Sequence, residues 1–150
     1  GEVFLPHYEP VRVEGDREGY PLFLWLYEPL MLGSSYAANL PWLQEYLAPH
    51  LSVRWESWVE INPRTARELG FRDGQEVWVE SPADRIKMKL RTYAGTMPGL
   101  ASCALGQGHT ALGRWAKDRG ENPLKLLGRQ VDHLAGSVAL LSTRVKLYEV

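Results

Sequence analysis

The stretch that decides the fold covers residues 58–92 and reads WVEINPRTARELGFRDGQEVWVESPADRIKMKLRT. It opens with the short apolar segment Trp58–Ile61, which predicts a strand. It closes with an alternating segment in which Ile86, Met88 and Leu90 point to one side while charged residues point to the other. This order predicts a strand, a helix and a β-hairpin that share one buried face.

A short helix is expected directly after the first strand. Asn62 is a good N-cap because its side-chain oxygen can accept a hydrogen bond from the first turn, and Pro63 is preorganised for the first helical position. Gly70 supplies the left-handed residue that ends many helices, and Phe71 supplies the apolar contact that often follows it. The sequence therefore predicts a helix over residues 63–69.

The second strand of the expected hairpin carries a row of cations, namely Arg85, Lys87, Lys89 and Arg91. Such a row can follow the phosphates of a nucleic acid. However, Glu76 and Glu80 on the preceding strand are placed to be cross-strand partners of these cations. We therefore favour a solvated, charge-paired sheet face and predict no nucleic-acid partner.

The flanking sequence predicts further short elements separated by turn residues. Strands are expected over residues 21–27, 75–81, 100–105 and 137–150, a short helix or compact loop over 39–47 that ends before Pro49, a helical turn over 111–117 and a short helix over 122–127. Many short strands with few helices are typical of a compact β-barrel with helical insertions. The fold class is thus mainly β with short helices, with a single domain over residues 21–150 after an irregular N-terminal arm over residues 1–20.

Composition excludes several classes of protein. The chain has 150 residues and a net charge of −1, which suits one domain with no electrostatic preference for nucleic acid or an anionic membrane. Cys103 is the one cysteine, so an internal disulfide or a multi-cysteine metal site is excluded. The apolar run Leu22–Leu32 is interrupted by Glu28 and Pro29, so we expect no direct insertion into a membrane.

A glycine-containing loop is the strongest candidate for a binding site. It consists of Gly106, Gln107, Gly108, His109 and Thr110, and its backbone is able to approach a ligand closely. An ordinary tight loop with a surface histidine is the competing interpretation. No catalytic constellation accompanies the loop, so the chain is interpreted as a binding domain without catalytic residues or metal ligands.

Two further residues are candidates beyond this loop. Arg114 follows a glycine and is able to pair with a phosphate through two parallel hydrogen bonds, although a solvated helix charge is equally ordinary. Asn122 is able to present its amide to a ligand, but its position before Pro123 is also explained completely by a helix cap.

The pattern of residues 58–82, with Asn62-Pro63, Leu69-Gly70, Asp73-Gly74 and Ser81-Pro82, resembles a known domain. It is similar to the C-terminal molybdopterin-dinucleotide-binding domain of the DMSO-reductase-type oxidoreductases. Residues 39–45 and 106–114 resemble more narrowly the quinone-linked branch of that family, which contains the polysulfide or thiosulfate reductases and the large subunit of alternative complex III.

This resemblance implies a fold and a cofactor. The fold would be a six-stranded double-psi β-barrel that covers one side of a bis-molybdopterin guanine dinucleotide and performs no chemistry of its own. The implied cofactor-binding residues are Gly106, Gln107, Gly108, His109, Thr110, Arg114 and Asn122, together with Ser34, which lies where many members carry a histidine-rich loop. Because no histidine occurs there, a structural interface domain with an empty site is the alternative.

The resemblance also implies partners. The molybdenum ligand and the iron–sulfur cysteines would lie in upstream domains of the same chain, and the start at Gly1 fits a fragment of a longer protein. Iron–sulfur and membrane subunits of a quinone-linked complex would complete the assembly, peripheral to the membrane on its extracytoplasmic side. A stand-alone enzyme on this barrel is disfavoured. An aspartic protease would need the tripeptide Asp-Thr-Gly or Asp-Ser-Gly, which the sequence lacks. A decarboxylase would need a Gly-Ser self-cleavage site, and the Gly-Ser dipeptides present are too short a pattern to indicate one.

Overall fold

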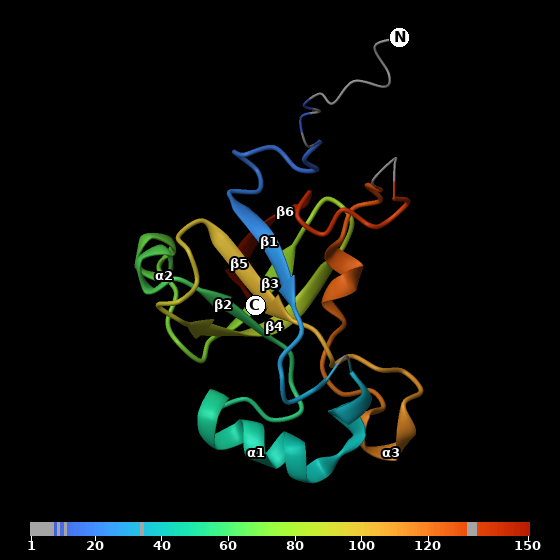
Figure 1. Cartoon of the computed structure of the whole chain (residues 1–150). Coiled ribbons are helices and arrows are strands. Elements are labelled where there is room, and N and C mark those ends of the chain that lie inside the picture. Colours follow the sequence, from blue (N-terminus) through green and yellow to red (C-terminus); the bar gives the residue numbers. More distant parts are fainter. Residues whose placement is uncertain (1–7, 9, 11, 34, 132–134) are drawn as a thin grey trace.

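The computed structural model describes residues 8, 10, 12–33, 35–131 and 135–150 (Figure 1). Six strands form a closed barrel in the circular order β1-β5-β2-β4-β3-β6. These strands are β1 (Leu22–Tyr27), β2 (Trp58–Ile61), β3 (Glu76–Glu80), β4 (Arg85–Thr92), β5 (Leu100–Ala104) and β6 (Arg144–Glu149). The predicted mainly β fold is therefore confirmed.

The strand order contains an internal repeat. Strand β1 runs parallel to β5 and antiparallel to β6, while β4 runs parallel to β2 and antiparallel to β3. Exchanging β1 with β4, β2 with β5 and β3 with β6 gives the same circular order, read in the reverse direction. The barrel thus consists of two interlocked three-stranded halves, which is the architecture of a double-psi barrel.

The barrel interior is filled by the apolar residues that alternate along the strands. Val77 and Val79 of β3 and Met88 and Leu90 of β4 are almost completely buried. Leu24 of β1 joins the same cluster from the other side of the barrel. Because side chains along a strand alternate between its two faces, the period-two pattern of the sequence identified these inward positions correctly.

The predicted helix forms between β2 and β3 as α2 (Pro63–Leu69). The side chain of Asn62 accepts a hydrogen bond from the backbone N–H of Arg64 at 2.9 Å, so the N-cap is confirmed. Gly70 has φ 79° and ends the helix in the left-handed conformation. The backbone N–H of Phe71 bonds the carbonyl of Ala66 at 2.8 Å, which completes the C-terminal cap.

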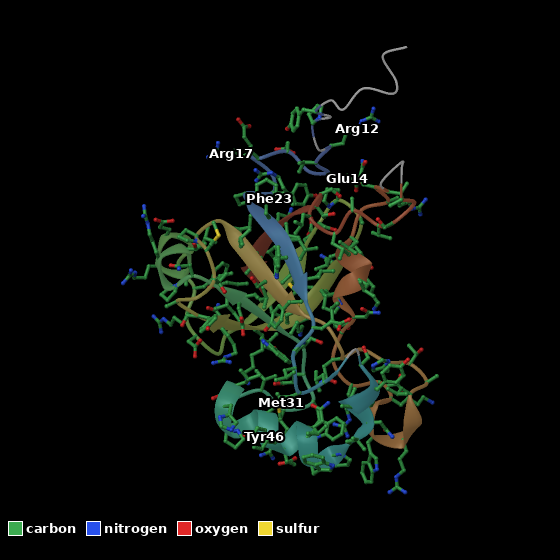
Figure 2. The ribbon with its side chains drawn as sticks, in the orientation of Figure 1. Arg12, Glu14, Arg17, Phe23, Met31 and Tyr46 are labelled. Carbon is green, nitrogen blue, oxygen red and sulfur yellow. The ribbon has the colours of Figure 1, made fainter. Side chains whose placement is uncertain are left out.

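The remaining helices are short, and two of them lie beyond one end of the barrel. These are η2 (Tyr36–Asn39), α1 (Pro41–Leu51), α3 (Gly113–Ala116) and η3 (Pro123–Leu126), with α1 and α3 below the barrel in Figure 1. Met31 lies between the barrel and α1, which carries Tyr46 (Figure 2). Within the described residues, no helix has the length and apolar character that crossing a membrane requires.

The prediction that the first helix ends before Pro49 is wrong, because α1 continues through Pro49 to Leu51. A proline this near the end of a helix removes only one of its last hydrogen bonds. Leu47 and Leu51 pack with Val53 and Trp58 in a second apolar cluster beneath the barrel. The burial of this helix face outweighs the local cost of the proline.

The predicted long terminal strand over residues 137–150 is also wrong, because only Arg144–Glu149 forms the strand β6. The preceding residues bond to neighbouring loops instead of extending the ladder. The carbonyl of Ser142 accepts from the N–H of Glu14 at 2.7 Å, and the Thr143 hydroxyl oxygen accepts from the N–H of Gly128 at 3.0 Å. The apolar residues at 138–141 suggested a strand, but these tertiary contacts determine the backbone.

The row of cations on β4 is charge-paired in part: of the two predicted partners, Glu76 pairs with the row, whereas Glu80 pairs with Lys146 of β6. Lys87 lies 3.9 Å from Glu76, and Lys89 lies 3.5 Å from Glu56. The Arg85 guanidinium stands 5.0 Å from the centre of the Trp78 ring. These contacts explain Arg85, Lys87 and Lys89 as parts of a solvated sheet face.

Candidate functional site

The glycine loop and the segment after β1 meet at one end of the barrel. Strands β1 and β5 are parallel, so the chain leaves both of them in the same direction. The two exits are bonded together, because the N–H of Leu105 donates to the carbonyl of Tyr27 at 2.8 Å. We call the described parts of segments 35–44 and 106–122 the rim, because they lie at this end of the barrel.

Gln107 faces inward at the base of the rim. It is almost completely buried, and its amide nitrogen donates to the Gln44 side-chain oxygen at 2.8 Å. The Gln44 amide nitrogen lies 3.3 Å from the Gln107 oxygen and donates to the carbonyl of Ala38 at 3.0 Å. The side chain predicted to contact a ligand is therefore used to hold the two segments of the rim together.

Gly108 and Asn122 lie in direct contact, so the structure brings together two predicted site residues 14 positions apart. Gly108 has φ 80°, and a Cβ at this position would overlap the backbone of Glu121 and Asn122. The Asn122 oxygen accepts from the N–H of Leu124 at 3.1 Å. Asn122 is thus a helix cap, the alternative interpretation of this residue.

His109 has an unusual environment. Its backbone carbonyl accepts from the N–H of Asp118 at 2.7 Å, which fixes the loop. Its side-chain Nε2 atom is buried and has no hydrogen-bond partner in the described chain. A buried polar atom without a partner is costly, so a group outside the described residues, such as a water molecule, an ion or a ligand, is expected to supply the bond. The next residue, Thr110, is exposed.

Arg114 lies on α3 at the outer part of the rim. Its guanidinium stands 4.3 Å from the centre of the Trp115 ring, and both side chains are exposed. The helix is held by Asn39, whose side-chain oxygen accepts from the N–H groups of Trp115 at 2.9 Å and Ala116 at 3.0 Å. Arg114 is therefore stacked and accessible to an anion.

The sequence interpretation missed three residues that build the rim. Asn39 caps α3 and Gln44 pairs with Gln107, as described above. The Ser57 hydroxyl donates to the carbonyl of Glu121 at 2.6 Å and accepts from its N–H at 2.9 Å. All three act across more than 60 positions of sequence, so no local pattern indicates them.

Other predictions at the site have simpler outcomes. Ser34 lies outside the described residues. In the described ranges, no three His, Cys, Asp or Glu residues gather where they could hold a metal ion. Burial raises the pKa of the Cys103 thiol well above its usual range, with a further contribution from Glu60, as suits an inert core residue.

Residues 35–143 match the protein family described as the Molydopterin dinucleotide binding domain. The chain belongs to this family. The matched range contains the rim and four of the six barrel strands, β2 to β5, and it ends at residue 143, directly before β6 begins at Arg144.

Several curated proteins are similar to this family member. Arsenate respiratory reductase molybdopterin-containing subunits share 31% identity with it, over 99% of the chain for Shewanella sp. and 93% for Chrysiogenes arsenatis. The menaquinone reductase molybdopterin-binding-like subunit of Nitratidesulfovibrio vulgaris shares 29% identity over 77% of the chain. The chain spans only 17–18% of the length of these relatives.

A solved structure with the same fold is acetylene hydratase from Pelobacter acetylenicus. It superposes on 95% of this chain with a TM-score of 0.76 and 18% sequence identity, and the match covers 21% of the hydratase. At this identity the likeness concerns the fold alone. It agrees with the closed barrel derived from the strand pairing.

Proposed function

We propose that this molybdopterin-dinucleotide-binding domain forms one side of the cofactor site of a larger oxidoreductase and performs no chemistry of its own. The observation that carries the proposal is the buried Nε2 atom of His109, which has no partner in the described chain. It lies on the loop Gly106–Thr110, which the sequence resemblance leads us to expect at the cofactor. A bound cofactor would satisfy this nitrogen.

The donors of the rim fit an anionic dinucleotide. The Arg114 guanidinium is exposed and is suited to a diphosphate, since its planar group can make two parallel hydrogen bonds to phosphate oxygens. The Thr110 hydroxyl is exposed one position after His109. We propose the guanine dinucleotide form, with His109, Thr110 and Arg114 as its side-chain ligands. The molybdenum redox chemistry would belong to the cofactor when bound.

A second candidate function is an interface domain with an empty site. It is favoured by the amides of Gln107 and Asn122, which bond within the chain instead of facing outward. In that case the unpartnered nitrogen of His109 would bond a neighbouring domain instead of a cofactor.

The proposed assembly extends beyond this chain. We propose upstream domains of the same polypeptide as its immediate neighbours, and iron–sulfur and membrane subunits of a quinone-linked complex as further partners. One relative is a menaquinone reductase subunit, which supports the quinone-linked branch. An extracytoplasmic position, peripheral to the membrane, is part of the same proposal.

Cofactor retention in the longer polypeptide tests the proposal. The variant Arg114→Ala is compared with Lys117→Ala, a matched removal of a nearby exposed cation. Molybdenum content and the fluorescence of the oxidised pterin are measured after purification. We expect Arg114→Ala to retain less cofactor than Lys117→Ala. Equal and full retention would assign Arg114 to the surface, and the absence of cofactor from the parent protein would favour the interface domain.

A further inference from the structure

A concave site separate from the rim lies on the outer surface of the barrel. It has a volume of about 450 Å³ and is lined by Trp25, Tyr27, Glu60, Tyr93, Gly95, Thr96, Met97, Leu100 and Ser102. These residues come from β1, β2, β5 and the loop between β4 and β5. We call this site the aromatic cleft. It shares no lining residue with the rim, so it is a separate feature of the molecule.

The loop that walls the aromatic cleft is firmly anchored. The Tyr93 N–H donates to the carbonyl of Ile61 at 2.9 Å, and the Asn62 amide donates to the carbonyl of Thr96 at 2.7 Å. At its far end, the carbonyl of Gly99 accepts from the N–H of Phe23 at 2.9 Å. These bonds tie the loop to three elements, so the cleft is preformed and a ligand would not have to order it.

The cleft contains one charged group. Tyr27 and Glu60 lie side by side, because the Trp58 indole Nε1–H is within 3.1 Å of the Tyr27 hydroxyl and 3.2 Å of the Glu60 carboxylate. Burial, with the nearby Glu60, raises the pKa of Tyr27 far above its usual range, so its hydroxyl stays neutral. The Glu60 carboxylate is therefore the sole charge among the lining residues.

Glu60 has no ion pair in the described part of the chain. Arg91 is its cross-strand neighbour on β4, yet none of the described ion pairs joins the two side chains. By contrast, Glu76 and Glu80 on β3 each have a lysine partner. The carboxylate of the cleft is thus available to an incoming cation.

The walls of the cleft are suited to hold that cation. Trp25 is 42% exposed, Tyr93 56% and Met97 67%. Aromatic faces attract cations, and this chain already stacks Arg144 on Phe23 at 3.9 Å and Arg85 on Trp78 at 5.0 Å. Within the described contacts, neither aromatic wall of the cleft carries such a cation.

We propose that the aromatic cleft binds an arginine side chain presented by a protein segment that packs against this outer face of the barrel. Arginine fits better than lysine because its planar guanidinium pairs with a carboxylate through two hydrogen bonds and also stacks on aromatic rings. Exposed tryptophan, tyrosine and methionine around a charged pocket are the composition of a protein interface. The Glu60 carboxylate supplies the charge complementarity.

A titration with a capped amino acid tests this inference. Nα-acetyl-L-arginine amide is added to the ¹⁵N-labelled chain, and the indole signal of Trp25 and the amide signals of residues 93–102 are followed by NMR. We expect saturable shifts confined to these signals. Glu60→Gln is expected to weaken the affinity on the order of tenfold, as for the loss of a charge-assisted pair. Glu76→Gln, which removes a carboxylate on β3, is expected to leave it unchanged.

A further variant and two competing ligands test whether the loss of binding reflects unfolding and which ligand the cleft prefers. Tyr93→Leu, at a half-exposed position, is expected to weaken binding while the thermal midpoint stays near that of the parent. Equal affinities of Glu60→Gln and Glu76→Gln, or no saturable Trp25 shift, would overturn the proposal. Stronger binding of choline than of the arginine amide would replace it by an alkylammonium site. Stronger binding of free arginine than of the capped form would replace it by a small-molecule site.

Discussion

The segment over residues 58–92 and the rim differ in how their backbones are held. In the first, the cap of Asn62, the left-handed Gly70 and the alternation along β4 all act between residues close in sequence. In the rim, Gln44 bonds Gln107 and Asn39 bonds the first turn of α3, across 63 and more positions. The backbone of residues 58–92 is therefore fixed largely by contacts between residues close in sequence, whereas the backbone of the rim is fixed by contacts between distant segments.

The surroundings of two glycines illustrate this difference between the two regions. Gly70 has φ 79° and Gly108 has φ 80°, so both adopt the same left-handed conformation. A Cβ on Gly70 would have no atom within 4 Å, whereas a Cβ on Gly108 would overlap the backbone of Asn122. The same local geometry thus serves a simple helix end in one region and a close approach of two chain segments in the other.

The largest expected effect comes from Gly108→Ala. The added methyl group must push the Gly108 loop away from the backbone of Glu121 and Asn122, so we expect a loss of about 3 kcal/mol or more in the free energy of unfolding. Gly70→Ala is the matched control, with only the left-handed strain of about 1 kcal/mol. Urea denaturation of both variants measures the difference. Equal losses would show that the contact between Gly108 and Asn122 gives way easily and that the rim is not a tight junction.

A smaller effect is expected from the buried amide pair. Gln107→Met removes one partner and leaves the Gln44 amide short of a bond, at a cost of about 1–3 kcal/mol. The double variant Gln44→Met/Gln107→Met should cost less than the sum of the single variants by about 1 kcal/mol. A double-mutant cycle by chemical denaturation measures this coupling. If Gln107→Met left stability unchanged but lowered cofactor retention, Gln107 would be a ligand after all.

Asn39→Ala is expected to loosen α3 alone. Its side-chain oxygen caps that helix from η2, so its loss should cost about 1 kcal/mol. Amide hydrogen exchange should accelerate at Trp115 and Ala116 and remain unchanged in β4. Faster exchange throughout the barrel would mean that the rim and the barrel unfold as one unit, against the separation drawn above.

Sequence patterns identified the barrel because its signals are short-range. Period-two burial in β3 and β4 and the two caps of α2 follow from side-chain direction and hydrogen bonding within a few residues. The six-stranded, double-psi strand order came from the family resemblance, because parallel pairs such as β1 with β5 leave no local signature. The predicted end of α1 and the predicted start of β6 were wrong for the same reason, because tertiary contacts determine both boundaries.

The candidate site was predicted less completely than the barrel. Of the loop residues, Gly108 lies against the backbone of Asn122. The roles of the Gln107 and Asn122 side chains could not be predicted from the sequence, because an amide group can equally well bond a ligand, cap a helix or pair with another amide. Gln107 bonds Gln44, and Asn122 caps η3. The structure supplies these partners, and within the described residues it leaves the buried Nε2 atom of His109 without one.

The smallest expected effect concerns a surface pair on the well-predicted side of the molecule. Glu80 lies 2.8 Å from the Lys146 ammonium and accepts from the Tyr148 hydroxyl at 2.7 Å. The Lys146 hydrogen bond, followed by that of Tyr148, holds the pKa of Glu80 below its ordinary value of 4.5. A carboxyl group with a lowered pKa stabilises the fold above its ordinary pKa, and this contribution is lost as the pH falls through the lowered value.

Lys146→Met should therefore raise the pKa of Glu80 toward its ordinary value, as measured by NMR titration of the Glu80 side-chain carboxyl carbon. The stability difference between variant and parent should be present at pH 7 and should shrink as the pH falls from the ordinary pKa of Glu80 through the lowered pKa of the parent. Lys117→Met, which removes an exposed cation of the rim, is the control and should leave the titration of Glu80 unchanged. The effect is expected to be small because both partners are partly exposed to solvent, which screens their attraction. A stability difference that persisted unchanged through the acid range would have to come from the lost packing of the Lys146 chain against Tyr20 and Tyr148 instead of from its charge.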